Sequence, residues 1–330
     1  MQKPVLTIVV PCYNEEDVLP ETIKQLTNVL EHLMEEHLIA GGSKVLFVDD
    51  GSRDRTWELI EQESEQNPLV TGIKLSRNFG HQKALLAGLE TAKNDSDCVI
   101  SIDADLQDDV SAIREFVMKY WEGYDIVYGV RRSRDADTWF KRATAQWFYR
   151  FMQKLGVHVV YNHADFRLMS KRALEELSRY TEVNIFLRGI VPLLGFRTTK
   201  VFYDRKERFA GQSKYPLKKM LSFAFDGITS FSIAPIRFIT FIGFLAFFLS
   251  SIAGIYALAV KLLGHAESGW TSIIISIWFI GGLLLMGIGL IGEYIGKIYQ
   301  EVKRRPRFTI EKTLRSPALP PLSKKEKVQL

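Results

Sequence analysis

The sequence has only two cysteines, Cys12 and Cys98, in 330 residues. Both lie in apolar, strand-like runs, so neither a disulfide framework nor a zinc site built from paired cysteines is available. The N-terminus also lacks the basic, apolar and small-residue succession of a secretory signal, because strand-like sequence begins by Val5. We therefore expect this part of the chain in a reducing, cytosolic setting.

Two common nucleotide-binding signatures are missing as well. The first strand–helix turn has no G-x-G-x-x-G, and no G-x-x-x-x-G-K-[ST] occurs in the chain, which disfavours a Rossmann dehydrogenase and a P-loop NTPase. The formal net charge is a modest +5, which suits an anionic partner such as a membrane surface or a phosphate without requiring one. We expect no nucleic acid among the partners.

Charge is absent from two long stretches near the C-terminus, Phe238 to Val260 and Ser268 to Gly292. Each can cross a hydrocarbon core of about 30 Å as a helix that rises roughly 1.5 Å per residue. The short connection Lys261–Glu267 then predicts a hairpin of two transmembrane helices; the alternative is a pair of buried helices in a soluble protein. Basic residues lie on both outer flanks, so the positive-inside rule places both flanks in the cytoplasm.

The first 130 residues alternate apolar, strand-like runs with helical patterns. The expected strands are Val5–Val10, Lys44–Val48, Val70–Leu75, Cys98–Ile100 and Asp125–Val130. This alternation predicts an α/β fold with a doubly wound, mostly parallel sheet.

Polar side chains recur where these strands end: Tyr13 and Glu15, Asp50, Arg77, and then Asp103, Asp105 and Gln107. Open α/β sheets bind ligands at the carboxyl ends of their strands, so a nucleotide can lie across this edge with its base near Tyr13. Two carboxylates one residue apart, followed by an amide oxygen, suit Mg²⁺ or Mn²⁺ shared with a phosphate. A D-x-D on its own is also typical of a solvated acidic turn that caps the next helix.

These loops read, in order, V-V-P-C-Y-N-E-E, V-D-D-G-S-R-D-R-T, L-S-R-N-F-G and D-A-D-L-Q-D. The set resembles family 2 glycosyltransferases with the A-type nucleotide-sugar fold, and among them the polyprenyl-phosphate glycosyltransferases, including dolichyl-phosphate mannose synthases and bactoprenol glucosyltransferases. The resemblance runs from about residue 5 to residue 300. It implies a nucleotide-sugar site and a metal and diphosphate site. The first comprises Pro11, Tyr13, Glu15, Asp50, Arg77 and Asp103; the second comprises Asp103, Asp105 and Gln107.

Later segments indicate an anionic acceptor. Guanidinium forks suit phosphate, and the resemblance implies that Arg131, in the run Gly129–Arg134, contacts one; a solvated basic loop is the alternative. The segment Arg205–Tyr215 looks like the family's R-x-x-G-x-S-K-Y loop. There Arg208, Ser213 and Lys214 supply donors for a lipid head group, unless the segment is merely a basic juxtamembrane loop.

The segment Ala164–Ser170 matches the family's D-F-R-L motif, in which the residue at Asp165 is usually suspected of acting near the acceptor. A phosphate monoester has a second pKa near roughly 6, so a lipid phosphate is largely deprotonated at neutral pH and needs no strong base. Asp165 therefore has two open roles, as a base or as a residue that orients the acceptor or the sugar. Pairing between Arg167 and Asp165 for structural reasons alone is a further alternative.

Four regions follow from these features: a cytoplasmic catalytic domain (1–212), a juxtamembrane interfacial helix (213–235), two transmembrane helices (236–297) and a basic cytoplasmic tail (298–330). The aromatic and basic segment Trp139–Leu155 fits a further interfacial helix or a plain core helix. We expect a multi-pass protein of the cell membrane with both termini cytoplasmic. Glycines in the second span favour close helix contacts, and with the resemblance they suggest a homo-oligomer.

The predicted reaction is inverting transfer of a hexose from a UDP-sugar to undecaprenyl phosphate at the cytoplasmic leaflet, for modification of a cell-envelope glycan. Glucose and N-acetylglucosamine are favoured, and mannose from GDP-mannose stays open. The expected cofactor is Mg²⁺ or Mn²⁺, and the expected catalytic residues are Asp103, Arg131 and Asp165. A flippase and a second glycosyltransferase are expected downstream.

Two other classes of protein remain. A processive polysaccharide synthase shares the nucleotide half, but it normally carries a Q-x-x-R-W motif and more spans, and this sequence has no such motif. A non-catalytic membrane scaffold would bind a nucleotide-sugar without turning it over.

Overall fold

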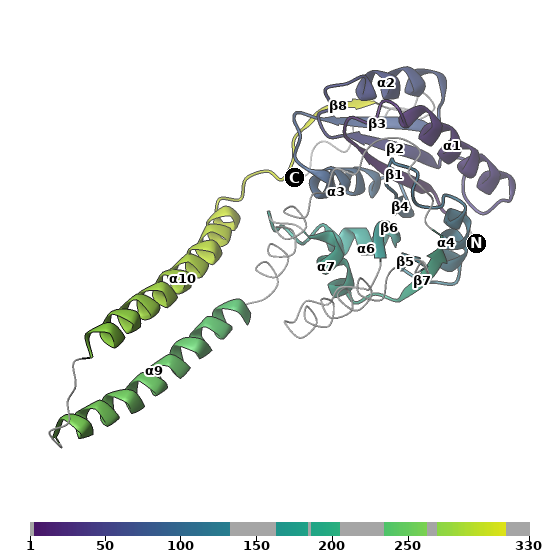
Figure 1. Ribbon diagram of the computed structural model, residues 1–330. Coiled ribbons are helices and arrows are strands. Elements are labelled where there is room, and N and C mark those ends of the chain that lie inside the picture. The colour runs from purple at the N-terminus through teal and green to yellow at the C-terminus, as the bar shows by residue number, and fades with distance from the viewer. Residues whose placement is uncertain (1–2, 133–162, 184–185, 205–233, 263–268, 315–330) are drawn as a thin grey trace, which may run out of the picture. The chain divides into compact units, whose positions relative to one another are not determined.

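The computed structural model describes residues 3–132, 163–183, 186–204, 234–262 and 269–314 (Figure 1). The chain forms two compact units, one of residues 1–149, 159–214 and 306–330 and the other of residues 150–158 and 215–305. The predicted acceptor residues Arg208, Ser213 and Lys214 lie outside the described residues, as do both predicted interfacial helices up to residue 233.

The first unit is built on a mixed sheet whose described strands follow the order β7-β5-β6-β4-β1-β2-β3-β8. Their bounds are β1 (Leu6–Cys12), β2 (Lys44–Asp49), β3 (Val70–Leu75), β4 (Cys98–Ser101), β5 (Ile126–Arg131), β6 (His163–Ser170), β7 (Thr198–Tyr203) and β8 (Ile310–Leu314). Strands β4, β1, β2 and β3 run parallel, as do β5 and β7, whereas β6 and β8 are antiparallel to their neighbours. The predicted α/β fold with a mostly parallel sheet is confirmed.

Helices connect these strands. They are α1 (Leu19–Glu35), α2 (Thr56–Gln66), α3 (His81–Ala92), α4 (Ala112–Trp121), α6 (Lys171–Leu177), α7 (Leu187–Ile190) and the 3-10 turn η1 (Val191–Leu194). Helix α1 begins with Pro20 in its first turn, where a missing N–H costs nothing, and buries Ile23, Leu26 and Leu30 at helical spacing. Strand β1 is buried along its whole length, as expected for a parallel strand covered on both faces.

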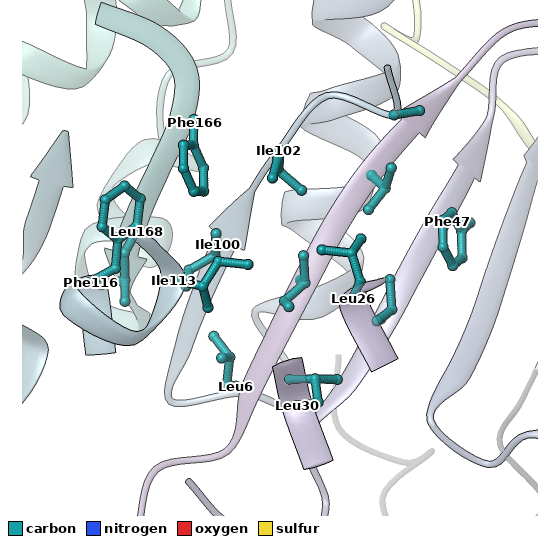
Figure 2. Packing of buried hydrophobic residues seen from close by; sticks show 14 of the residues in the cluster. Leu6, Leu26, Leu30, Phe47, Ile100, Ile102, Ile113, Phe116, Phe166 and Leu168 are labelled. Carbon is teal, nitrogen blue, oxygen red and sulfur yellow. The ribbon is translucent and has the colours of Figure 1, made fainter. Parts of the chain in front are cut away.

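The core combines β-branched strand residues with aromatic side chains (Figure 2). The ring centroids of Phe116 and Phe166 lie 4.5 Å apart, and Tyr203 meets Phe166 edge-on at 5.3 Å. Each fully buried aromatic side chain stabilises the fold by roughly 1.5–3 kcal/mol relative to an exposed one. These contacts join α4, β6 and β7, and they fix the part of the sheet that carries the arginines of the site.

The second unit contains two long helices, α9 (Ala234–Leu262) and α10 (Trp270–Val302). Among the described residues one segment, Phe279–Val302, is long and apolar enough to cross a membrane by length and composition. The described residues therefore provide one candidate span, and the expected hairpin of two spans is not established by this criterion.

Strand β8 was not foreseen by the sequence analysis, which placed it in the basic tail. It pairs with β3 in antiparallel register, with Thr313 opposite Ile73, and the amide of Ser76 donates to the carbonyl of Thr309 at 3.0 Å. Arg307 leads into the strand and donates to the carbonyl of Tyr180 at 2.8 Å and to the carboxylate of Glu90 at 2.5 Å. The segment that follows α10 thus belongs to the sheet of the first unit.

Candidate active site

The strand-end loops predicted from the sequence lie at one edge of the sheet, because β1, β2, β3 and β4 are parallel. Strand β1 continues through Pro11 to Cys12, whereas the sequence analysis ended it at Val10. Pro11 pairs with Val48 of β2 and lies beyond the last pair between β1 and β4. The proline therefore interrupts no pairing with β4, since that ladder has already ended.

The loops after β1 and β2 are joined by hydrogen bonds. The amide of Asn14 donates to Ser52 Oγ at 3.0 Å, and the amide of Glu15 donates to Thr56 Oγ1 at 2.9 Å. Asn14 has a φ of 53°, a left-handed conformation that asparagine tolerates better than most residues. These bonds fix the loop on which Tyr13 is 36% exposed, so its ring is available for stacking against a base.

Asp50 ties the second loop to the third. Its Oδ1 accepts from the amide of Phe79 at 2.7 Å and its Oδ2 from the amide of Gly80 at 2.9 Å, while the residue is buried. That Asp50 binds the nucleotide stays a prediction. The structure shows in addition that its carboxylate holds the loop after β3. Arg77 is exposed and lies over the ring of Phe79, 4.0 Å from its centroid.

The acidic loop after β4 alternates between exposed and buried side chains. Asp103, Asp105 and Gln107 are partly exposed, whereas Ala104 and Leu106 are buried. The amide of Gln107 donates to Asp105 Oδ1 at 3.2 Å, and Leu106 has a φ of 54°, a conformation that costs a residue of this kind energy. The alternation leaves all three oxygen-bearing side chains of the predicted metal set accessible.

Three oxygen donors at a strand end fit a hard cation. Mg²⁺ in particular is commonly held by one or two carboxylates together with substrate phosphates, so a complete protein cage is not needed. Within the described ranges no group of three or more His, Cys, Asp or Glu side chains is arranged to hold a metal ion. The oxygens of Asp103, Asp105 and Gln107 fit a hard cation only as a partial set of ligands, to which a substrate diphosphate would add its own oxygens.

Arg131 is held by a buried carboxylate. Asp108 Oδ1 accepts from Arg131 Nη2 at 2.9 Å and Nε at 3.2 Å, and from the hydroxyl of Tyr203 at 2.6 Å. Burial opposes the charge of Arg131, but Asp108 and Tyr203 outweigh it and raise its pKa. The Arg131 side chain stays 27% exposed, so one face of the guanidinium remains available at the site.

Asp165 lies at the centre of a second network. Arg167, two residues away on β6, bonds its Oδ1, and Arg188 of α7 spans both oxygens through Nε at 3.2 Å and Nη2 at 3.0 Å. His81 Nε2 and Gln82 Nε2 reach Asp165 Oδ2 at 3.2 Å and 3.3 Å. His81 also lies 3.6 Å from Asp103 Oδ1, so this network reaches the acidic loop.

These contacts set the charges of the acidic groups. Burial, together with Asp165 and the other carboxylates, raises the pKa of Asp103 to about 6, although His81 opposes the shift. Burial opposes ionisation of Asp165 too, but the hydrogen bond from His81 and the charges of Arg167 and Arg188 hold its pKa well below the usual range. The pKa of His81 rises to about 9, because its bond to Asp165 and the charge of Asp103 outweigh burial.

Comparison with known proteins identifies the family. The model of a family described as Glycosyl transferase family 2 matches residues 7–178. A Bacillus subtilis (strain 168) protein named uncharacterized glycosyltransferase YkoT is 68% identical over 328 residues, which cover 99% of this chain and 97% of that protein. The chain belongs to glycosyl transferase family 2.

This glycosyltransferase is also related to bactoprenol glucosyl transferases. The SfII prophage-derived bactoprenol glucosyl transferase of Shigella flexneri is 38% identical over 315 residues, covering 94% of this chain and 98% of that protein. Among solved structures, the Pyrobaculum calidifontis mannosyltransferase PcManGT in complex with GDP-Man and Mn²⁺ is 15% identical with a TM-score of 0.41, covering 91% of this chain and 86% of that one.

Sequence reasoning missed five residues of the site: His81, Gln82, Asp108, Arg188 and Tyr203. Asp108 stands within the D-A-D-L-Q-D motif and His81 directly follows L-S-R-N-F-G, so their proximity to recognised motifs was an available signal. Arg188 and Tyr203 lie in stretches without a motif, and only the packing of α7 and β7 brings them to the site.

Proposed function

We propose that this glycosyltransferase transfers a single hexose from a UDP-sugar to undecaprenyl phosphate at the cytoplasmic leaflet, with inversion at the anomeric carbon. The observation that carries the proposal is the placement of a cation and an acidic loop in one unit: Arg131 is held by the buried Asp108, and Asp103 lies 3.6 Å from His81. The relatives named as bactoprenol glucosyl transferases support this acceptor. The product would serve a flippase and a second glycosyltransferase that modifies a cell-envelope glycan.

The donor lies across the strand ends. Tyr13 offers an exposed ring to the base, and the exposed Arg77 would lie at the rim. Glu15 would accept hydrogen bonds from nucleotide N–H or hydroxyl groups. Asp50 is 2% exposed and holds the amides of Phe79 and Gly80, so it would support the nucleotide through these loops. The oxygens of Asp103, Asp105 and Gln107 would hold Mg²⁺ or Mn²⁺, which supplies positive charge against the leaving diphosphate.

The acceptor phosphate is the nucleophile. One of its oxygens attacks the anomeric carbon, the bond from that carbon to the diphosphate breaks, and the nucleoside diphosphate leaves with the electron pair. Arg131 would hold the attacking phosphate in line, and such positioning supplies much of the rate because donor and lipid otherwise meet rarely. In the acceptor loop, Arg208, Ser213 and Lys214 complete the proposed phosphate contacts.

The membrane part supports a lipid substrate. Large apolar side chains are exposed along α9, including Phe238 at 64% and Phe241 at 66%, and along α10, including Leu285 at 71%. Exposed apolar surface of this extent indicates contact with lipid or protein. We assign both helices to the bilayer as a hairpin in a multi-pass, homo-oligomeric protein, with 1–212 as the catalytic domain, 213–235 at the interface and 298–330 on the cytoplasmic side.

A transfer assay tests the proposal. Purified protein receives Mg²⁺, undecaprenyl phosphate and one labelled donor at a time, from UDP-glucose and UDP-N-acetylglucosamine to GDP-mannose. We expect a lipid-linked sugar from one donor, loss of product with a metal chelator, and at least a 100-fold loss in Asp105→Ala. Asp109→Ala, a neighbouring carboxylate that bonds Ser111, is the matched control. Failure of every donor, with nucleotide-sugar still bound, would favour the scaffold instead.

A further inference from the structure

We propose that Arg188 binds phosphate oxygens of a substrate beside Arg131, and that Asp165 is the positioning residue that holds Arg188 rather than a base. This inference rests on the proposed transfer to a lipid phosphate. It assigns a ligand contact to Arg188, a residue that no sequence motif marks, and it decides between the two roles left open for Asp165.

The carboxylate of Asp165 is fully occupied. Its Oδ1 accepts from Arg167 and from Arg188 Nε, and its Oδ2 accepts from His81, Gln82 and Arg188 Nη2. A carboxylate offers about four lone-pair sites, so these contacts leave no site for a proton from an acceptor. The side chain is also only 3% exposed, which keeps a substrate from reaching it.

Arg188 is the member of this network that reaches the open site. Its side chain is 34% exposed, whereas that of Arg167 is 1% exposed. A guanidinium carries five N–H groups, and the contacts of the described residues use two of them on Asp165. The remaining edge of the planar fork can bind phosphate oxygens, since Asp165 fixes its orientation.

Arg131 repeats this arrangement. Asp108 bonds it through Nε and Nη2, as Asp165 bonds Arg188, and the side chains of Arg131 and Arg188 are 27% and 34% exposed. Burial opposes the charge of Arg188, Asp165 and Asp103 raise its pKa, and Arg131 lowers it. An anion bound at Arg188 would relieve this unfavourable effect of Arg131.

His81 and Gln82, at the start of α3, also hold the Asp165 carboxylate in place. Gln82 Oε1 accepts from the amide of Leu187 at 3.1 Å, the residue before Arg188, while its Nε2 donates to Asp165. The first turn of α3 therefore holds both the carboxylate and the backbone that carries Arg188. A change at Asp165 is expected to act through Arg188.

The test uses the full-length protein in five forms: wild type, Arg188→Ala, Arg188→Lys, Asp165→Asn and the double variant Asp165→Asn/Arg188→Ala. Arg179→Ala is the matched control, since this arginine is 77% exposed and pairs with Glu176. KM and kcat are measured for the donor and for undecaprenyl phosphate. Binding of UDP and of a water-soluble, short-chain polyprenyl phosphate is measured by titration calorimetry.

We expect Arg188→Ala to weaken the binding of one of the two phosphate ligands by about 10- to 100-fold, which is the range expected for a lost charge-assisted hydrogen bond. A higher KM and weaker binding for the lipid phosphate assign Arg188 to the acceptor, and weaker UDP binding assigns it to the donor. Lysine should restore part of the loss, because it keeps the charge without the fork. Values equal to those of Arg179→Ala for both ligands would overturn the inference.

Asp165→Asn should show the same pattern as Arg188→Ala, and the double variant should be little worse than either single variant. A base would behave differently: kcat alone would fall, the loss would multiply with that of Arg188→Ala, and the acidic limb of the pH–rate profile would vanish. If Asp165→Asn does not fold, the two Arg188 variants still decide whether Arg188 binds a phosphate. If the wild type transfers no sugar, the proposed function fails, whereas the binding titrations still test the phosphate contact.

Discussion

Buried carboxylates organise the cations of this active site. Asp108 and Asp165 are each almost inaccessible, and each bonds one partly exposed arginine through two nitrogens. A fixed arginine loses less side-chain freedom when it binds an anion, so in the proposed phosphate contacts the carboxylates would contribute to affinity without touching the ligand. The acidic residues of the site thus divide into accessible ones, Asp103 and Asp105, and buried ones that hold cations.

Asp108→Asn tests this role. The amide keeps the shape but not the charge, so Arg131 and Tyr203 lose a charged acceptor, and we expect a loss of about 1–3 kcal/mol in the free energy of unfolding. Chemical denaturation of the purified protein measures it. Asp109→Asn, at the neighbouring carboxylate, is the control and should cost less, because Asp109 is partly exposed whereas Asp108 is buried. Equal losses would contradict the account.

At the scale of elements, Asp125 joins the start of β5 to β6 and α6. It accepts from Ser170 at 2.9 Å and from Arg172, and its own carbonyl accepts the amide of Ser170 at 2.8 Å. Burial opposes ionisation, but the bonds from Arg172 and Ser170 lower the pKa of Asp125 below its usual value.

A pH dependence of stability follows from that shift. Because the folded pKa lies below the unfolded one, Asp125 stabilises the fold above the unfolded pKa of about 3.9 and loses this contribution as the pH falls through the folded value. Asp125→Asn should therefore lower stability at pH 7 and flatten its decline in acid, as measured by denaturation between pH 7 and pH 3. Glu122→Gln, an exposed pair with Lys119, should leave the decline unchanged. An unchanged decline in Asp125→Asn would refute this role.

The contact of α3 with the sheet depends on a glycine. A Cβ at Gly88 would lie 2.3 Å from Val9 Cγ1 and 2.8 Å from Val48 Cγ2, and valine is stiff at χ1. Gly88→Ala gains up to about 1 kcal/mol of helix propensity, but we expect a net loss of about 1–2 kcal/mol from overpacking. Gly41→Ala, which would meet open space, is the control. A stabilised Gly88→Ala would show that the strands move apart easily.

Local elements of the fold could be predicted from the sequence, whereas contacts between distant segments could not. The five strands predicted before residue 131 and their loops were confirmed, because apolar runs and the common direction of parallel strands are local signals. The pairing of Arg167 with Asp165 was among the alternatives from the sequence and is confirmed. The contacts of Arg188 could not be predicted, since this residue is distant in sequence from Asp165 and carries no motif. Strand β8 reads I-E-K-T-L, in which three polar residues separate two apolar ones, so no alternating pattern distinguished it from a polar tail.

For the whole molecule, the return of the chain after α10 to the catalytic sheet is the main architectural finding. Arg307 holds this segment through Tyr180 and Glu90 with a side chain that is only 16% exposed. In chain order the α9–α10 region is therefore followed by a strand of the first unit's sheet.

Arg307→Ala tests that second link. Loss of two hydrogen bonds from a mostly buried guanidinium should destabilise the first unit by about 1–3 kcal/mol and speed hydrogen exchange in β8 and β3. Hydrogen exchange of the detergent-solubilised protein measures the exchange rates of the backbone amides in β8 and β3. Arg305→Ala, an exposed neighbour, is the control. Unchanged exchange in β8 would show that β8 does not depend on this anchor.

The mass of the lipid product tests the central claim most directly. Purified protein is incubated with Mg²⁺, undecaprenyl phosphate and the donor it accepts, and the extracted lipid is followed by mass spectrometry over time. The account predicts one species, undecaprenyl phosphate plus a single hexose or N-acetylhexosamine, that increases in amount but not in mass. A product whose mass grows with time would indicate a processive synthase, and a lipid that stays unmodified with every donor would contradict the account altogether.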